Sequence, residues 1–165
     1  MPHLLDKKNV DMLTSQKVFS EAELKSRCEI MLDNYCKTVR IEADTMIDMA
    51  RPEITPAIEA YATELARAAA AKKALAADIP CTYETSLVQK LSSLTDRITQ
   101  KISELEQALL DLASAEDIIA EGYAIRDTVL VKMSELRAAC DEAEIVTAKK
   151  YWPFPTYGDL LFGVK

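Results

Sequence analysis

Few side chains in this sequence are of the types that perform acid–base or nucleophilic chemistry. Histidine occurs once, as His3, in an N-terminal stretch that we expect to be frayed. Because no serine or cysteine in an ordered region can have a histidine as its base, the sequence excludes a catalytic triad. It also lacks the paired Glu-x-x-His motifs of a metal-binding helical bundle and a glycine-rich phosphate loop. The residue types present therefore do not form a catalytic centre of these kinds.

Carboxylates are abundant, with 27 Asp and Glu against 20 Lys and Arg. The densest group lies in "IEADTMIDMA", where Asp44 and Asp48 are one helical turn apart and Glu42 is nearby. Like charges at this spacing are mildly unfavourable and common on exposed helices. We interpret them as a solvated surface, and we predict no catalytic, cofactor-binding or metal-binding residue in this chain.

Cysteine occurs four times, without the CxxC spacing of a zinc or redox motif and without the density of a secreted disulfide scaffold. We predict that all four are reduced and act as small apolar side chains. They are Cys28, Cys36, Cys81 and Cys140.

The formal net charge is −7 and the sequence pI is about 4.8, with acidic and basic residues interspersed. No basic face is available for a phosphate backbone. No apolar run approaches the roughly 20 residues that span a bilayer, and the N-terminus lacks the pattern of a signal peptide. We therefore expect a soluble, cytoplasmic protein that binds neither nucleic acid nor membrane.

Helix-forming residues dominate the sequence, which has only six Pro and three Gly. Apolar residues recur at steps of three and four, and this periodicity predicts three long helices at about residues 20–77, 82–113 and 115–150. Short turns between long helices favour antiparallel neighbours. The predicted fold is therefore all-α, an elongated antiparallel bundle.

The first predicted helix begins with a capping box, in which Ser20 caps the helix and Glu23 reaches back. Pro52 and Pro56 remove two backbone donors and predict a kink inside this helix. Its apolar positions are expected to form one stripe, made of Leu24, Cys28, Met31, Tyr35, Val39, Ala43, Met46 and Ala50.

The second predicted helix has the clearest apolar pattern in the chain. At the start of the third, Ser114 with Asp117 could form a weaker cap. Gly122 inside this helix is unfavourable by about 1 kcal/mol relative to Ala, which we attribute to another backbone that passes close. The stripe of the second helix consists of Leu87, Leu91, Leu94, Ile98, Ile102, Leu105, Leu109 and Leu112.

The sequence ends in an aromatic segment, "KKYWPFPTYGDLLFGVK", which holds the only Trp. Pro153 and Pro155 lack backbone donors, so we predict that the third helix ends near Lys150 and that residues 151–165 form a non-helical tail. Aromatic side chains are buried where they can be, so the tail either covers the end of its own bundle or docks on another domain or subunit. In the first case Trp152 and Phe154 are largely buried. The predicted anchor or interface residues are Tyr151, Trp152, Phe154, Tyr157, Leu160, Leu161 and Phe162.

Two segments carry a resemblance to a known family: "CKTVRIEADTMIDMARPEITPAI" and "KKYWPFPTYGDLLF". They resemble the C-terminal region of type III glutamine synthetase, and the similarity runs over nearly the whole chain. The resemblance implies a parent enzyme that uses ATP, with Mg or Mn, to ligate ammonia to glutamate. It also implies that the substrate and metal residues lie in regions preceding this segment, so none of them is in this chain.

The same resemblance implies a domain organisation and partners. Residues 1–19 would be a linker from the upstream catalytic region, and residues 20–165 a helical C-terminal domain with a structural, assembly or regulatory role. Its partners would be the catalytic domain of the same polypeptide and neighbouring subunits of a homo-oligomer built from two stacked hexameric rings. The alternative is a freestanding helical-hairpin adaptor, which accounts for the helices but not for the aromatic tail.

Overall fold

The computed structural model describes residues 2–155 and 157–163, and it leaves out the side chains of Pro2 and Tyr157. The described residues contain helices and no strand, which confirms the all-α prediction. The chain forms, in order, η1 (Pro2–Leu5), α1 (Lys7–Ser15), α2 (Glu21–Met49), η2 (Ala50–Ile54), α3 (Thr55–Leu75), α4 (Thr82–Asp111), η3 (Leu112–Ser114), α5 (Ile118–Ala124), η4 (Ile125–Val129), α6 (Leu130–Val146) and α7 (Tyr157–Phe162).

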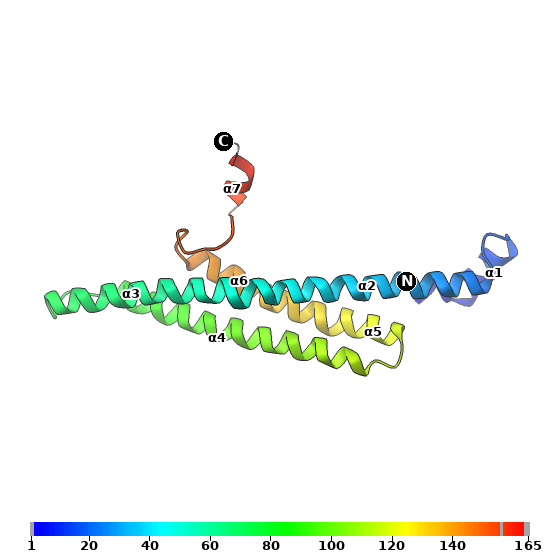
Figure 1. Ribbon diagram of the computed structural model, residues 1–165, viewed down its shortest axis with the longest axis horizontal. Coiled ribbons are helices and arrows are strands. Elements are labelled where there is room, and N and C mark those ends of the chain that lie inside the picture. Colours follow the sequence, from blue (N-terminus) through cyan, green and yellow to red (C-terminus); the bar gives the residue numbers. More distant parts are fainter. Residues whose placement is uncertain (1, 156, 164–165) are drawn as a thin grey trace. The chain divides into compact units, whose positions relative to one another are not determined.

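The chain divides into two compact units. Figure 1 shows the helices coloured along the sequence. The first unit contains the chain up to Asp44 together with Leu105–Lys132, and the second contains Thr45–Glu104 together with the chain from Met133 onward. Helices α2, α4 and α6 each contribute residues to both units. The elongated shape of the bundle stays a prediction.

The capping box at the start of α2 is confirmed. The Glu23 carboxylate accepts hydrogen bonds from the backbone N–H of Ser20 at 2.8 Å and from its hydroxyl at 2.9 Å. In return the Glu23 N–H donates to the Ser20 hydroxyl oxygen at 3.3 Å. Two backbone donors that would otherwise lack an intrahelical acceptor are thereby satisfied, which fixes where α2 begins.

A π-helical turn, η2, connects α2 to α3 where the prolines occur. Both the N–H and the hydroxyl of Thr55 donate to the carbonyl oxygen of Ala50, the latter at 2.9 Å. Pro52 has no backbone N–H to donate. The helix continues past it through the wider turn, in which the Thr55 N–H bonds to a carbonyl five residues back. A kink at Pro52 and Pro56 stays a prediction.

The stripe predicted for the first helix is only partly right. Met31 is exposed, and Tyr35 and Met46 are half-buried. The neighbouring residues Leu32, Cys36 and Ile47 are buried in their place, because the steps of three in the buried pattern fall later along the helix than predicted. The buried set of α2, η2 and α3 is Leu24, Cys28, Leu32, Cys36, Val39, Ala43, Ile47, Ala50, Ile54, Ile58, Ala62 and Leu65.

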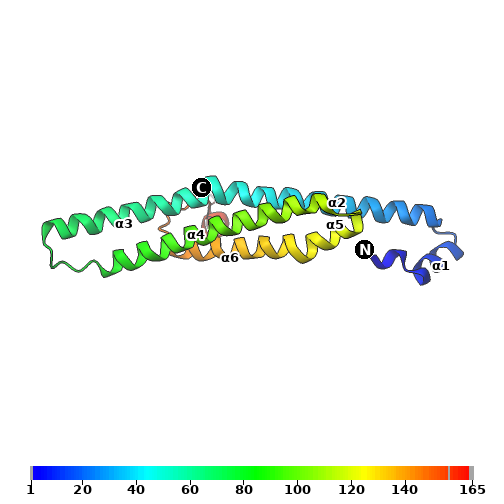
Figure 2. The same ribbon diagram turned by 90° about the horizontal axis from the view of Figure 1, so that it is seen from below.

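In the first unit, α5 lies along α2 (Figure 2). The guanidinium of Arg40 on α2 pairs with the carboxylate of Glu121 on α5 at 2.9 Å, and both side chains are partly buried. Ile125 and Val129 of η4 are fully buried, so the π-helical turn contributes to the core of this unit.

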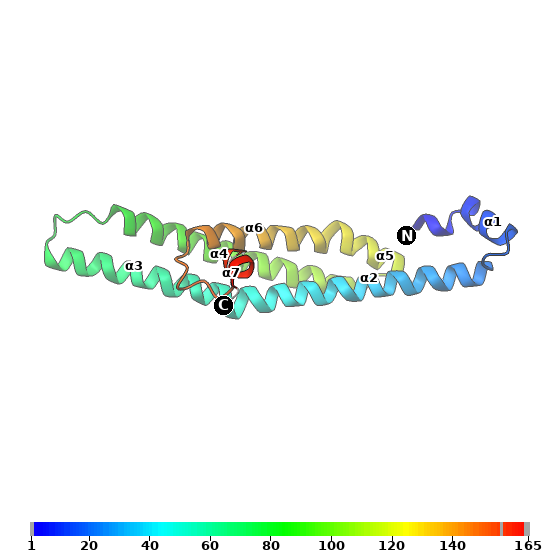
Figure 3. The ribbon, with the colours of Figure 1, turned by 90° about the horizontal axis from the view of Figure 1, so that it is seen from above.

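In the second unit, α3 and α4 form a hairpin (Figure 3). Lys72 pairs with the nearly buried carboxylate of Glu84 across the turn, and this hydrogen bond lowers the pKa of Glu84. Helix α6 lies against α4, where Lys101 pairs with Glu135 at 2.9 Å. The stripe predicted for the second helix is confirmed in its central positions, because Leu91, Leu94, Ile98, Ile102 and Leu105 are all at most 3% exposed.

The third predicted helix begins later than expected. Ser114 lies in η3 and donates its hydroxyl to the carbonyl of Asp111, so it completes the end of α4 instead of capping α5. Asp117 is the N-cap, and its carboxylate accepts from the Ala120 N–H at 2.7 Å. The helix is interrupted by η4 and ends at Val146, four residues before the predicted end.

Both ends of the chain contain more helix than the sequence suggested. The stretch that we predicted as a linker, residues 1–19, includes η1 and α1. The prediction of a non-helical tail is wrong for Tyr157–Phe162, which form α7. Pro155 is the last proline, so the residues after it are able to donate helical hydrogen bonds, and Asp159 in the first turn favours the N-terminal end of a helix.

Replacing the cap of α2 should destabilise the protein. We expect Ser20→Ala to lower the free energy of unfolding by about 1 kcal/mol, because two hydrogen bonds of the box are lost. The measurement is chemical denaturation followed by circular dichroism. The control is Ser93→Ala, at an exposed position inside α4, which should be neutral or slightly stabilising. Equal stability of Ser20→Ala and the control would contradict the cap assignment.

The same capping box should depend on pH. The hydrogen bonds from the backbone N–H and hydroxyl of Ser20 lower the pKa of Glu23 below its ordinary value of 4.5. A carboxyl whose pKa is lower in the folded state stabilises the protein above the unfolded pKa, and this contribution disappears as the pH falls through the folded pKa. The stability difference between the wild type and Ser20→Ala should therefore be constant near neutral pH and become smaller below pH 4.5. A difference that is independent of pH would show that Glu23 contributes little.

Candidate functional site

The aromatic tail begins directly after α6, in the second unit. Two turn hydrogen bonds redirect the backbone there: the Tyr151 N–H donates to the Ala148 carbonyl at 2.8 Å, and the Trp152 N–H donates to the Lys149 carbonyl at 3.2 Å. These bonds use the donors immediately before Pro153. The tail therefore leaves the helix in a defined direction.

Tyr151 attaches the start of the tail to α3. Its ring lies 5.3 Å from the ring of Tyr61, measured between centroids, at an interplanar angle of 32°. Its hydroxyl donates to the carboxylate of Glu64, and the Lys150 ammonium donates to the same carboxylate at 2.9 Å. The ammonium also lies 4.7 Å from the Tyr151 ring centroid. One carboxylate thus holds two consecutive residues of the chain against α3.

Burial and a hydrogen bond with Tyr83 raise the pKa of Tyr61, so its phenol stays protonated under ordinary conditions. The ring on which Tyr151 packs is therefore neutral. An open groove of about 570 Å³ lies beside this contact, and its wall is mainly α3. Its lining residues are Pro56, Glu59, Ala60, Thr63, Glu64, Arg67 and Tyr151.

The remaining tail residues are less covered than the sequence suggested. Trp152 and Phe154 are partly buried, and the expectation that they are largely buried stays a prediction. Tyr151, at the start of the tail, contacts α3 through its ring and its hydroxyl. The tail therefore does not cover the bundle along its full length.

Helix α7 carries three exposed apolar side chains and stands clear of α3 and α6 (Figure 1). Leu160 is 67% exposed, Leu161 70% and Phe162 84%, and we call these three residues the α7 apolar patch. An ion pair of 2.7 Å between Lys149 and Asp159 connects the first turn of α7 to the start of the tail. The side chain of Tyr157, which we also predicted as an anchor, lies outside the described part of the chain.

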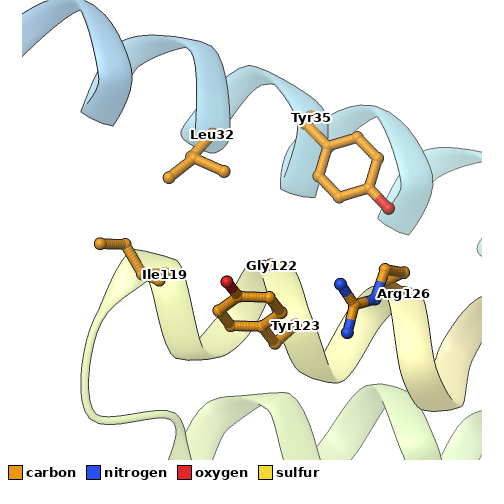
Figure 4. Close-up of a pocket in the computed structure, with 6 residues that line it drawn as sticks. All are labelled: Leu32, Tyr35, Ile119, Gly122, Tyr123 and Arg126. Carbon is orange, nitrogen blue, oxygen red and sulfur yellow. The ribbon is translucent and has the colours of Figure 1, made fainter. Parts of the chain in front are cut away.

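A second candidate site is a small pocket in the first unit, with a volume of about 130 Å³ (Figure 4). Leu32 and Tyr35 of α2 face Ile119, Gly122 and Tyr123 of α5 and Arg126 of η4. Our sequence analysis did not find this site. The only signal was Gly122, for which we expected a neighbouring backbone; the nearest atom to an added Cβ is instead a side-chain carbon of Leu32, at 3.5 Å.

The residues considered for chemistry are separate from both sites. Glu42, Asp44 and Asp48 are exposed on α2, and no three His, Cys, Asp or Glu side chains within the described residues are grouped as metal ligands would be. All four cysteines are free and buried, which confirms their assignment as reduced apolar side chains. Burial raises the pKa of Cys140 to about 11, so this thiol is protonated at neutral pH.

None of the helices in the described part of the chain is long and apolar enough to cross a membrane. The described fold is all-α, and exposed aromatic and apolar side chains line or form both of its candidate sites.

Comparison with known proteins identifies the family. A family model described as "Glutamine synthetase C-terminal domain" matches residues 1–73. A glutamine synthetase of Butyrivibrio fibrisolvens is 31% identical over the whole chain, a Type-3 glutamine synthetase of Dictyostelium discoideum is 23% identical over 98% of it, and a glutamine synthetase of Bacteroides fragilis is 25% identical over 97%. The chain spans only 22–24% of the length of these relatives.

The first 73 residues thus match the glutamine synthetase C-terminal domain family, and the whole chain is similar to part of a glutamine synthetase. The resemblance to type III glutamine synthetase is thereby confirmed, since the relatives include a Type-3 protein and align with nearly every residue of the chain, including the aromatic tail.

Tyr151 should control the order of the tail. We expect Tyr151→Ala to shift Trp152 fluorescence to longer wavelength and to increase its quenching by acrylamide, because the contacts with Tyr61 and Glu64 are lost. Tyr151→Phe keeps the ring contact and should have an intermediate effect. The control is Leu161→Ala, at an exposed position of α7. Identical Trp152 fluorescence and quenching for the wild type and Tyr151→Ala would contradict this anchor.

Proposed function

We propose that this chain acts as a non-catalytic accessory domain of a type III glutamine synthetase, with a structural, assembly or regulatory role. The observation that carries the proposal is the 31% identity that extends over all 165 residues while spanning 24% of a glutamine synthetase. A match of this extent includes the tail, which a generic helical hairpin would not need.

The reaction of the proposed parent enzyme is the ATP-dependent ligation of ammonia to glutamate, which yields glutamine. ATP and Mg or Mn would be bound by the catalytic region of that enzyme. The donor set described here does not fit a metal site, because the described part of the chain groups no three metal-ligating side chains. No step of the reaction is therefore assigned to these residues, and we place the domain in the cytoplasm with its parent enzyme.

The tail is the proposed anchor or interface. Tyr151 holds its start, while the α7 apolar patch remains exposed to solvent. Apolar surface contributes roughly 25 cal/mol per Å² when it is removed from water, so three large exposed side chains on one short helix favour docking on a second surface. We propose that this surface belongs to the catalytic domain of the same polypeptide or to a neighbouring subunit of a homo-oligomer. Residues 1–19 would link the domain to the catalytic region.

A helical-hairpin adaptor is the second candidate function. It is favoured by the α3–α4 hairpin, where Leu75 is 83% and Tyr83 65% exposed. An adaptor would bind its partner through the turn of the hairpin, whereas an accessory domain would bind through the tail. Variants at the two surfaces therefore distinguish the two functions.

The proposal can be tested in the glutamine synthetase polypeptide that carries this domain. We expect the triple variant Leu160→Asp, Leu161→Asp, Phe162→Asp to dissociate the oligomer or to reduce its assembly at least tenfold in native mass spectrometry. Glutamine formation should fall with it. The side chains are exposed within the domain, so its helix content and melting temperature should be unchanged.

The control is the double variant Leu75→Asp, Ile145→Asp, at two residues that are each 83% exposed and lie outside the tail. We expect this control to assemble and to retain activity. Normal assembly of the triple variant, or loss of assembly in the control alone, would contradict a docking role for the tail. The second outcome would favour the adaptor.

A further inference from the structure

The pocket of the first unit has the walls of a site for an aromatic ring (Figure 4). Tyr35 on α2 faces Tyr123 on α5, and Arg126 lies at the same end of the pocket as Tyr35. Leu32 and Ile119 form the other end. All six lining residues belong to the first unit, so the pocket is built by one compact part of the chain.

Gly122 opens the pocket between these walls. A Cβ at this position would lie 3.5 Å from the nearest side-chain atom, on Leu32, which is an ordinary van der Waals contact. Alanine would therefore fit without a clash and would favour the helix, since glycine is less favourable than alanine inside a helix. Neither backbone conformation nor steric crowding requires glycine at this position, and its missing side chain leaves space between the pocket walls.

The size of the pocket matches one ring. A cavity of about 150 Å³ lined by apolar side chains is sufficient to bind benzene. The pocket measures about 130 Å³ and is accessible from solvent, because Ile119 is 36% and Tyr123 41% exposed. A ligand with two fused rings would extend out of it.

The charge of the pocket favours a neutral ligand. Nε and Nη2 of Arg126 donate to the two carboxylate oxygens of Asp127, at 2.6 and 2.7 Å. The guanidinium also lies 4.8 Å from the centroid of the Tyr123 ring. Its positive charge is therefore partly offset by an adjacent carboxylate, which weakens the attraction of an anionic ligand. The planar guanidinium stays available as a polar, stacking surface for a ring substituent.

We propose that this pocket binds a neutral, single-ring aromatic molecule of the phenol class, with the ring between Tyr35 and Tyr123 and the polar substituent toward Arg126. Two tyrosine faces favour an aromatic ring over an aliphatic one, because aromatic pairs gain from stacked or edge-to-face geometry beyond the area that they bury. This site goes beyond the proposed function, since neither catalysis nor assembly requires it. It would allow the domain to respond to a small molecule.

The test uses the full chain and phenol as the probe, with binding measured from the amide chemical shifts of the protein. We expect saturable binding with a Kd on the order of 1 mM, with the largest shifts at the six lining residues. Cyclohexanol, which has similar size but no aromatic ring, should bind at least tenfold more weakly. Benzoate should bind no more tightly than phenol.

Two variants on α5 separate binding from stability. Gly122→Ala should weaken phenol binding at least tenfold, because the added methyl group occupies the pocket, while the melting temperature stays the same or rises. Ala120→Gly, at an exposed position of the same helix, should lower the melting temperature and leave phenol binding unchanged. Gly122→Ala should therefore weaken binding without loss of stability, and Ala120→Gly should lower stability without loss of binding.

Several results would overturn the proposal. These are the absence of saturable phenol binding, equal phenol affinity in Gly122→Ala and the wild type, equal affinity for phenol and cyclohexanol, and tighter binding of benzoate. Failure of the assembly test on the tail would leave this site unaffected, because the pocket and the α7 apolar patch share no residue.

Discussion

Burial of the apolar stripe on α4 is the interaction on which both units depend. In the second unit Leu91 and Ile98 are completely buried, and in the first unit Leu105, where its part of α4 begins, is completely buried as well. Each unit therefore takes part of its core from the same helix. The ion pairs that α4 makes with α6 lie beside this stripe and are solvent-accessible, so they orient the helices more than they stabilise them.

The tail shows how the domain can be stable and still present apolar surface. Tyr151 and Lys150 both bind Glu64, which fixes the point where the chain leaves the helices. Beyond that point Trp152 and Phe154 are half-buried and the α7 apolar patch is exposed. The tail is thus fixed at its start and exposed at its end. Such a segment can be positioned by its own domain and buried against another surface, as the proposed role in a glutamine synthetase requires.

Local signals in the sequence predicted much of the fold. The Ser20 capping box and the stripe of α4 depend on residues close in sequence, with fixed spacing, and both predictions were confirmed. The two π-helical turns were not predicted, because the buried apolar positions at both turns still recur at helical spacing. Asp117 replaced Ser114 as the cap because η3 extended the end of α4, which the sequence pattern does not encode. The Gly122 pocket depends on which side chain of α2 lies opposite, and that is a property of tertiary packing.

The π-helical turn at Ala50–Ile54 sets the rotational phase of everything that follows it on the same helix. Ile47 is buried before the turn, Ala50 and Ile54 are buried at its two ends, and the buried positions then advance in fours to Ile58 and Ala62. Successive residues of an α-helix are about 100° apart, so losing one residue from the turn would rotate α3 by about that angle relative to α2. Ile58 would then point to solvent, and Tyr61 and Glu64 would no longer face Tyr151. A length change of one residue at an exposed proline-containing turn would thus be transmitted along α3 to the place where the tail is held.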